Sequence, residues 1–296
     1  MKPILMRHVE ASNESFKAWK NGDPYSRIPW HYHPEFELTY IHRGRGTFFV
    51  GDKMIEYDHN EMTLLGPNLP HEWRSEIDKV PDYYTETISV HFLYNFLGDK
   101  IYELPEVHVL NELLKKASRG IRVTDPQTKM IVKEKLMVLP ETKGLERIIK
   151  LLQILQSISV SPGLTFLASN SYVYTFDSSQ DHRINKVYEY VLKNFQQDIS
   201  VADVANISNM TKTSFCRFFK ERTNQPFVKY LNEIRVGYAC KLLLEGNLSI
   251  GQIAYESGFG NVSNFNKQFR SVKECTPSEY MNEFFEKKSK ERAVHV

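Results

Sequence analysis

The first half of the chain alternates apolar and polar residues over short stretches that turn residues separate. Such period-two alternation is typical of half-buried β-strands, because successive side chains of a strand point to opposite faces. Turns are indicated by Gly44, Gly46 and the pair Gly51-Asp52. The predicted strands are Phe36–Ile41, Thr47–Val50, Met54–Tyr57, Met62–Leu65, Trp73–Glu76 and Thr85–Phe92. Strands of this length and spacing predict a small antiparallel β-barrel over about residues 20–95.

The pattern changes to helical spacing over about residues 105–175. Two amphipathic stripes are present, and the one with fewer apolar residues comprises Val109, Leu110, Leu113 and Leu114. The segment Leu145–Leu155 is denser in apolar residues than one buried face requires. We therefore expect it to pack against the barrel or against a second copy of the chain. Polar and turn residues at 157–163 and 177–181 predict that this first domain ends at about residue 178.

The last third of the chain carries one local pattern twice, over residues 200–222 and 249–273. Each copy has a small residue, then a residue suited to left-handed backbone, then an N-cap and two phenylalanines four apart. The paired positions are Ala205 and Ala254, Asn209 and Gly258, Thr211 and Asn261, Phe215 and Phe265, and Phe219 and Phe269. A close helix crossing needs the small residue, and a tight turn needs the left-handed one. The repeat predicts two helix-turn-helix motifs.

A single helix is predicted between the two motifs, beginning near Pro226 and ending at Gly246. About 20 helical residues span ~30 Å. This length is close to the ~34 Å between successive major-groove faces on one side of B-DNA. One molecule could therefore engage two adjacent groove segments. We predict an all-α DNA-binding domain over residues 182–287, followed by a charged tail over 288–296.

Polar and basic residues occupy the face of each second helix opposite its phenylalanines. Residue types of this kind contact base edges and phosphates in the major groove. The segments 211–222 and 261–273 each have a net charge of +3. We expect Arg217, Lys212, Asn264 and Lys267 to reach bases, and Lys220 and Arg270 to bind phosphate. The full set of candidate DNA-binding residues is Lys212, Ser214, Arg217, Lys220, Asn261, Ser263, Asn264, Lys267 and Arg270.

Overall composition agrees with this organisation without specifying it. The 296 residues favour two domains, and the net charge of +2 is divided into +4 over residues 181–296 and −2 before them. Cys216, Cys240 and Cys275 lack metal-site spacing, which favours free thiols in a reducing compartment. A secretory signal and an apolar run of about 18 residues are both absent from the sequence. We therefore expect a cytoplasmic protein with no membrane partner.

One constellation of the first domain has the residue types of a metal or ligand site. His31, His33 and Glu37 share parity along an extended segment, so their side chains point to one face. Glu35 shares that parity, and parity alone does not choose between the two acids. His71 follows a Pro-rich loop downstream. Three hypotheses compete. The residues could form a pocket that hydrogen-bonds a small polar effector, or a metal site used for chemistry, because imidazole and carboxylate suit first-row metals. In the third hypothesis they are polar residues that only satisfy one another's hydrogen bonds. Of the other histidines, His42, His59, His91 and His108 have no partner at ligand spacing.

The second domain resembles the DNA-binding domain of AraC/XylS-type transcription regulators over about residues 185–284, a third of the chain. The matching positions are Arg235, Ala239, Leu242-Leu243, Ile250, Ile253-Ala254, Gly258-Phe259, Phe265, Phe269, Thr276-Pro277 and Tyr280. The resemblance implies a sequence-specific transcription regulator, usually an activator that works with RNA polymerase. It also implies a first domain that binds an effector, with a sugar as one candidate, and a homodimer formed through the helices after the barrel.

The row His31-x-His33-x-x-x-Glu37, followed by Gly44 and later by His71, resembles the two motifs of the cupin superfamily. In that family the corresponding residues bind a divalent metal inside the barrel. The resemblance therefore makes His31, His33, Glu37 and His71 candidates for both effector and metal binding, although no cofactor is required by it. Two positions depart from the motifs: Tyr25 replaces a leading glycine, and Asn68 replaces the glycine after the first proline of motif two.

Together these patterns predict an α+β protein of two domains, a cupin-like barrel with helices and an all-α DNA-binding domain. The function expected is a transcription regulator without catalytic residues. Two other functions remain open from the sequence: a metal-dependent cupin enzyme with a helical accessory domain, and a constitutive DNA-binding protein with a purely structural barrel.

Overall fold

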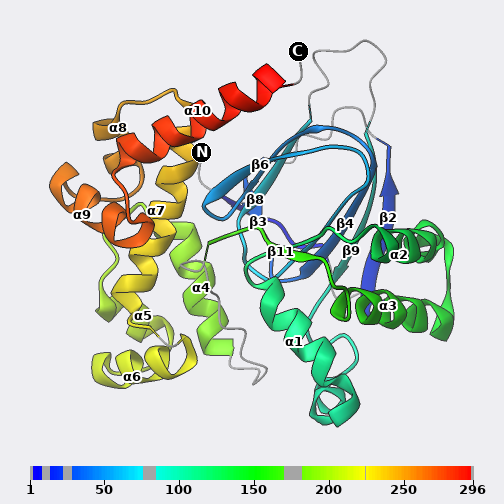
Figure 1. The fold of residues 1–296 in the computed structure, drawn as a ribbon. Coiled ribbons are helices and arrows are strands. Elements are labelled where there is room, and N and C mark those ends of the chain that lie inside the picture. The colour runs from blue at the N-terminus through cyan, green and yellow to red at the C-terminus, as the bar shows by residue number, and fades with distance from the viewer. Residues whose placement is uncertain are drawn as a thin grey trace. The chain divides into compact units, whose positions relative to one another are not determined.

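The computed structural model describes residues 3–8, 14–22, 29–75, 85–169, 182–223 and 225–294 (Figure 1). The chain divides into two compact units. The first comprises residues 1–51 and 55–180, and the second comprises residues 181–296 together with residues 52–54. The predicted linker at 177–181 and Tyr25 lie outside the described residues. A sheet-rich unit followed by a helical one confirms the two-domain α+β prediction.

The strands of the first unit form two sheets rather than one continuously hydrogen-bonded barrel. The five-stranded sheet has the order β1-β3-β8-β5-β6, with the bounds Ile4–Leu5, His31–Tyr32, His71–Ser75, Gly46–Val50 and Lys53–Tyr57. The six-stranded sheet has the order β11-β10-β7-β4-β9-β2, with the bounds Leu164–Phe166, Ile121–Val123, Glu61–Leu65, Phe36–Arg43, Glu86–Phe92 and Phe16–Asn21. Neighbouring strands are antiparallel except for β1, which pairs in parallel with β3. Six of these strands lie within a few residues of their predicted positions.

The six-stranded sheet has one apolar face and one polar face, as period-two alternation requires. The helices α1 (His108–Ala117), α2 (Pro126–Val138) and α3 (Gly144–Ser159) lie beside this sheet (Figure 1). The apolar side chains of the sheet pack against them. The buried core between them includes Phe36, Leu38, Tyr40, Met62, Leu64, Ile88, Val90, Phe92, Leu114, Leu136, Leu151, Ile154, Leu155 and Ile158. The main apolar core therefore lies outside the sheets, and their facing surfaces are free to carry polar residues.

The predicted helical region over residues 105–175 is only partly helical. Strands β10 and β11 interrupt it and extend the six-stranded sheet, with Ile121 opposite Leu64 and Ile121 opposite Phe166. Two short 3₁₀ helices, η3 (Pro105–Val107) and η4 (Leu139–Glu141), also lie in this region, and a third, η2 (Asp99–Glu103), precedes it. The prediction missed these strands because three residues are too short to establish an alternating pattern. Their pairing is decided by distant partners.

Within its described residues the second unit contains seven helices, and local signals explain where several of them begin or end. They are α4 (His182–Asn194), α5 (Val201–Ile207), α6 (Lys212–Thr223), α7 (Phe227–Glu245), α8 (Ile250–Glu256), α9 (Val262–Lys273) and α10 (Pro277–Val294). Ser200 and Ser249 form capping boxes at the first helix of each motif. Helix α7 ends at Gly246, which has the left-handed conformation of a helix C-cap. Helix α10 continues into the segment predicted as a charged tail. Within the described ranges, no helix is both long and apolar enough to span a bilayer.

Candidate functional site

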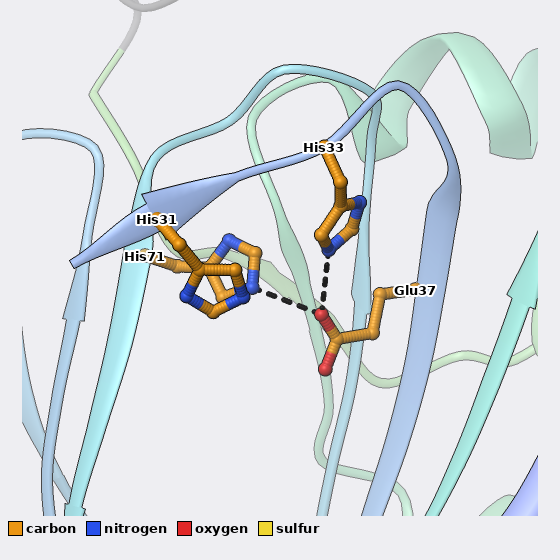
Figure 2. Close-up of side chains that lie close together, drawn as sticks. All are labelled: His31, His33, Glu37 and His71. Atoms are coloured by element: carbon orange, nitrogen blue, oxygen red, sulfur yellow. Dashed lines mark hydrogen bonds and ion pairs between the residues drawn. The ribbon is translucent and has the colours of Figure 1, made fainter. Parts of the chain in front are cut away.

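The four predicted ligand residues converge between the two sheets of the first unit (Figure 2). His31 lies on β3 and His71 lies opposite it on β8, while Glu37 projects from β4 of the other sheet. His33 lies in the connection from β3 to β4. One ligand atom from each of the four residues lies within 4.8 Å of the others, and all four side chains are buried. The sequence pattern therefore identified residues that the fold brings together.

Glu37 is the centre of the cluster. Its Oε2 lies 3.0 Å from His33 Nε2 and 2.9 Å from His71 Nε2. Its Oε1 accepts a hydrogen bond from Thr39 Oγ1 at 2.5 Å. Glu35, which parity could not exclude, instead accepts from the backbone N–H of His8 at 3.0 Å. The structure thus selects Glu37 for the cluster of four.

The histidine rings are oriented by the backbone next to them. Nδ1 of His31, His33 and His71 lies 2.9, 3.0 and 2.8 Å from the carbonyl oxygens of Pro29, Glu35 and Leu69, respectively. A hydrogen bond of this kind fixes the tautomer of a metal-binding histidine and directs the Nε2 lone pair inward. All three Nε2 atoms are therefore available to a cation.

In two of these rings, those of His33 and His71, each of the two nitrogens lies next to an oxygen acceptor: Nδ1 next to a backbone carbonyl and Nε2 next to Glu37. A neutral imidazole carries only one N–H. His33 and His71 therefore satisfy both contacts either as imidazolium cations, or as neutral rings whose Nε2 coordinates a cation placed beside Glu37. Two buried imidazolium ions next to a single carboxylate leave an uncompensated charge, which is costly. The donor set consequently fits a divalent metal.

The protonation states around Glu37 agree with coordination. Burial raises the pKa of Glu37, but the neighbouring His71 and His91 outweigh it and hold this pKa well below its ordinary value. Burial lowers the pKa of His31 and of His91 well below 6.5, and it also lowers the pKa of His8. At neutral pH Glu37 is therefore a carboxylate and His31 is a neutral imidazole, the forms that bind metals.

The departure from the cupin pattern at Asn68 has a structural explanation. Asn68 has φ of 59°, the left-handed conformation that glycine would adopt most easily. Asparagine is among the few other residues that tolerate it. The backbone N–H of Asn68 donates to the carbonyl oxygen of His33 at 2.7 Å. The left-handed position of this loop is thus made by asparagine in place of glycine, and the loop is tied to the motif-one histidine.

His91 and His8 also belong to the cluster. Sequence spacing gave His91 no partner and did not point to His8. His91 lies directly opposite Glu37 in the β4–β9 pairing, and its Nε2 is 3.7 Å from Glu37 Oε2. The ring centroid of His8 lies 4.1 Å from that of His91. Sequence spacing could not reveal either contact, because strand register and the course of residues 3–8 bring them together.

A cavity between the sheets opens onto this cluster. Its walls are formed by the inward-facing side chains of β2, β3, β4, β6, β8 and β9. On β4 and β9, alternate residues face the apolar core on one side of the sheet and this cavity on the other. The lining residues are His8, Trp19, Asn21, His31, Glu37, Thr39, Ile41, Tyr57, Trp73, Ser75, Thr85, Thr87, Ser89 and His91. Trp73 stacks on Phe48 with ring centroids 3.6 Å apart, and its buried indole N–H has no hydrogen-bond partner among the described residues.

In the helical unit the two motifs have the predicted geometry. Asn209 and Gly258 have φ of 55° and 86°, so both turns are left-handed. Asn261 caps α9 by accepting from the backbone N–H of Asn264 at 2.7 Å, and Thr211 accepts from that of Ser214 at 3.2 Å. Ala205 and Ala254 are buried at the helix crossings.

The predicted DNA-binding residues lie on α6, on α9 and at the start of α9. All of them are exposed except Ser214, whose half-buried hydroxyl accepts from Thr211 Oγ1 at 3.0 Å. The buried side chains of the same helices are Phe215, Phe219, Thr223, Phe265 and Phe269. Asn266 is also exposed on α9 and was not among the predicted contacts. Its assignment to DNA, like that of the predicted residues, remains a prediction.

Comparison with known proteins assigns a family to each unit. A model described as an AraC-like ligand binding domain matches residues 18–94, and a helix-turn-helix domain model matches residues 181–283. The HTH-type regulator YdeC of Bacillus subtilis is 21% identical over 282 residues, covering 93% of both chains. The activator RhaR of Mannheimia succiniciproducens is 23% identical, covering 88% of this chain and 89% of its own. A crystal structure of ToxT from Vibrio cholerae is 16% identical, with a TM-score of 0.38, covering 90% of this chain and 98% of its own.

The two domain matches follow the order of the two compact units, since residues 18–94 lie in the first unit and residues 181–283 lie in the second. The ligand-binding model matches the sheet-rich unit, and the helix-turn-helix model matches the helical unit. The chain belongs to the AraC-type HTH transcription regulators, with an AraC-like ligand-binding domain followed by a DNA-binding helix-turn-helix domain.

Proposed function

We propose that this regulator responds to a small, neutral, polyhydroxylated molecule of sugar type that binds between the two sheets. The observation that carries the proposal is the composition of the pocket wall. Hydroxyl, amide, indole and phenol groups line it together with three histidines and Glu37, and no lysine or arginine lies among the described lining residues. Without lysine or arginine, the wall itself supplies no permanent positive charge for an anionic ligand, whereas its hydroxyl and aromatic groups suit a neutral one.

Specific groups are positioned to bind such a molecule. The hydroxyls of Thr39, Thr87 and Ser89 come from adjacent strands β4 and β9, in which Thr39 is opposite Ser89. The unpartnered indole N–H of Trp73 requires an acceptor, which a hydroxyl oxygen of the ligand supplies. Trp19 and Tyr57 provide apolar faces for the C–H surfaces of a sugar ring.

Binding in the barrel controls transcription only if the effector has different affinities for two arrangements of the regulator. We propose that the effector-bound arrangement favours occupancy of two adjacent major-groove segments by α6 and α9, and that the chain acts as an activator together with RNA polymerase. We also propose a homodimer formed through α2 and α3. Val138, Leu145 and Ile149 on these helices are apolar and 48%, 71% and 44% exposed, respectively.

Ligand binding is tested by titrating the full chain with a panel of neutral sugars and with matched sugar acids, following tryptophan fluorescence. We expect saturable binding of a neutral sugar, weakened by Thr87→Val. Thr165→Val is the matched control, because Thr165 is exposed on β11 outside the pocket. The effector should also change the affinity for promoter duplexes obtained by genomic footprinting. Selective binding of the acids, or a Thr165→Val effect equal to that of Thr87→Val, would contradict the proposal.

We further propose that His31, His33, Glu37 and His71, hereafter the first ligand set, bind a divalent transition metal. The support is the pair of rings that face oxygen acceptors with both nitrogens, because a metal relieves that conflict. When bound, the ion would act as a Lewis acid toward an oxygen of the effector. Metal analysis of purified protein, compared with His71→Ala, tests this. DNA binding that survives metal removal supports a regulator, whereas stoichiometric metal with redox turnover would favour the cupin-enzyme alternative.

A further inference from the structure

A second group of histidines lies beside the first ligand set. One nitrogen each from His8, His33 and His91 lies within 4.8 Å of the other two. The ring centroid of His33 is 4.7 Å from that of His91 and 5.5 Å from that of His8. His8 Nε2 and His91 Nδ1 are buried and have no hydrogen-bond partner among the described residues. Buried unsatisfied imidazole nitrogens are uncommon and require an explanation.

We propose that His8, His33 and His91 form a second ligand set for a divalent transition metal such as Zn²⁺ or Ni²⁺. Three imidazoles with an open coordination position are an established donor set for these metals. Nitrogens about 2.1 Å from a shared ion lie up to about 4.2 Å apart. Small rotations of the three rings therefore complete the set. The set contains neither Glu37, His31 nor His71, so it does not depend on the first set being functional.

The two ligand sets share one atom and therefore compete. His33 Nδ1 faces the carbonyl oxygen of Glu35, so Nε2 is the nitrogen that His33 offers to a metal. One nitrogen lone pair binds one ion. A chain with both sets intact consequently binds a single ion, which has two alternative positions about His33.

Occupancy of the second set would fasten the N-terminal segment to the sheets. Residues 3–8 are held mainly through the backbone: Ile4 and Leu5 pair with His31 and Tyr32, and the His8 N–H donates to Glu35. The side chains of Ile4 and Leu5 are exposed. The ring of His8, stacked on Trp19 with centroids 5.7 Å apart, is the contact of this segment that faces the cluster. Metal bound to His8 and His91 would join the segment to β9.

Three double variants of the full chain test the proposal by calorimetric titration with Zn²⁺ and Ni²⁺. The first-set variant is His31→Ala/His71→Ala, and the second-set variant is His8→Ala/His91→Ala. The control is His42→Ala/His59→Ala, which removes two partly exposed histidines outside both sets. We expect one ion per chain in the wild type, in the control and in each set variant. The association constants of two alternative positions add in the wild type, so only the variant that lacks the tighter position should lose most of the affinity. That loss should be at least about tenfold, the lower range measured for losing even an outer-shell partner.

Removing His8 from the first-set variant should abolish binding, because neither set then remains. His8 lies outside the β-strands, so this change can be made even if the loss of His91 unfolds the sheet. Amide exchange gives an independent readout: metal should slow exchange over residues 3–8 in the wild type and the first-set variant, and have no such effect in the second-set variant.

The possible outcomes separate this proposal from the first ligand set. If the first-set variant binds no metal while the second-set variant binds as the wild type does, the second set is refuted and the first stands. If the first-set variant binds like the wild type while the second-set variant binds no metal, the first set is refuted and the second stands. Absence of metal binding in the wild type would refute both, and would leave the effector proposal to its own test.

Discussion

Replacement of Gly258 by alanine should destabilise the helical unit, because the turn between α8 and α9 has no room for a side chain. Gly258 has φ of 86°, and left-handed backbone costs a non-glycine residue about 1–2 kcal/mol. A Cβ at this position would lie 2.4 Å from the carbonyl oxygen of Phe195 and 2.8 Å from Cα of Gln196. Both are backbone atoms, which cannot rotate away as a side chain could.

The total cost follows from adding strain and overpacking. Forcing extra volume into a packed site costs about 1–3 kcal/mol. Together with the backbone strain, Gly258→Ala should lower the free energy of unfolding by about 2–5 kcal/mol. The carbonyl oxygen of Phe195 also accepts from Arg235 Nε at 2.7 Å. Displacing it would therefore disturb the contact that joins α7 to the end of α4.

Gly251 provides the matched control within the same motif. It lies in helix α8, and a Cβ there would meet no atom within 4 Å. Gly251→Ala should be neutral or stabilising by up to about 1 kcal/mol, because alanine favours helix. Denaturant unfolding of the full chain, followed by circular dichroism at the helix band, measures both changes. A Gly258→Ala midpoint equal to that of the wild type would refute the turn geometry, and with it the placement of α9.

Three further predictions concern the DNA contacts, the core and the pH dependence. Arg217→Ala should reduce the discrimination between cognate and scrambled duplexes by about 1–3 kcal/mol, measured by competition binding; equal losses on both duplexes would place Arg217 on phosphate instead. Leu155→Ala should cost about 2–5 kcal/mol of unfolding free energy, since the side chain is fully buried, and Leu145→Ala, at a position 71% exposed, should cost far less; similar losses would contradict the packing of α3. Because burial lowers the pKa of His31 and His91 well below 6.5, the unfolded chain binds more protons, so metal-free protein should lose stability as pH falls below about 6.5. Urea midpoints that are equal at pH 7.5 and 5.5 would contradict these buried neutral rings.

The helical unit could be predicted closely from the sequence because its signals are local. Ala254, Gly258 and Asn261 act within a few residues of themselves: one allows a helix crossing, one makes the turn, and one caps the next helix. The predicted strands from Phe36 to Phe92 follow for the same reason, since each alternating pattern and the turn residues that end it lie within a few positions of one another. The DNA-binding function depended on these local patterns and on their repetition.

Tertiary structure alone decided which face of the alternating strands would be core and which would be pocket. Both arrangements satisfy period two, and helices α1–α3, far along the chain, select the outer face as the apolar one. Strand register placed His91 opposite Glu37, and the course of residues 3–8 brought His8 to the same cluster. Pairing between residues more than 50 positions apart depends on the free energy of the whole fold, which no local window contains. The sequence therefore determined the kinds of element and four residues of the site, while the fold determined the rest of the site and its surroundings.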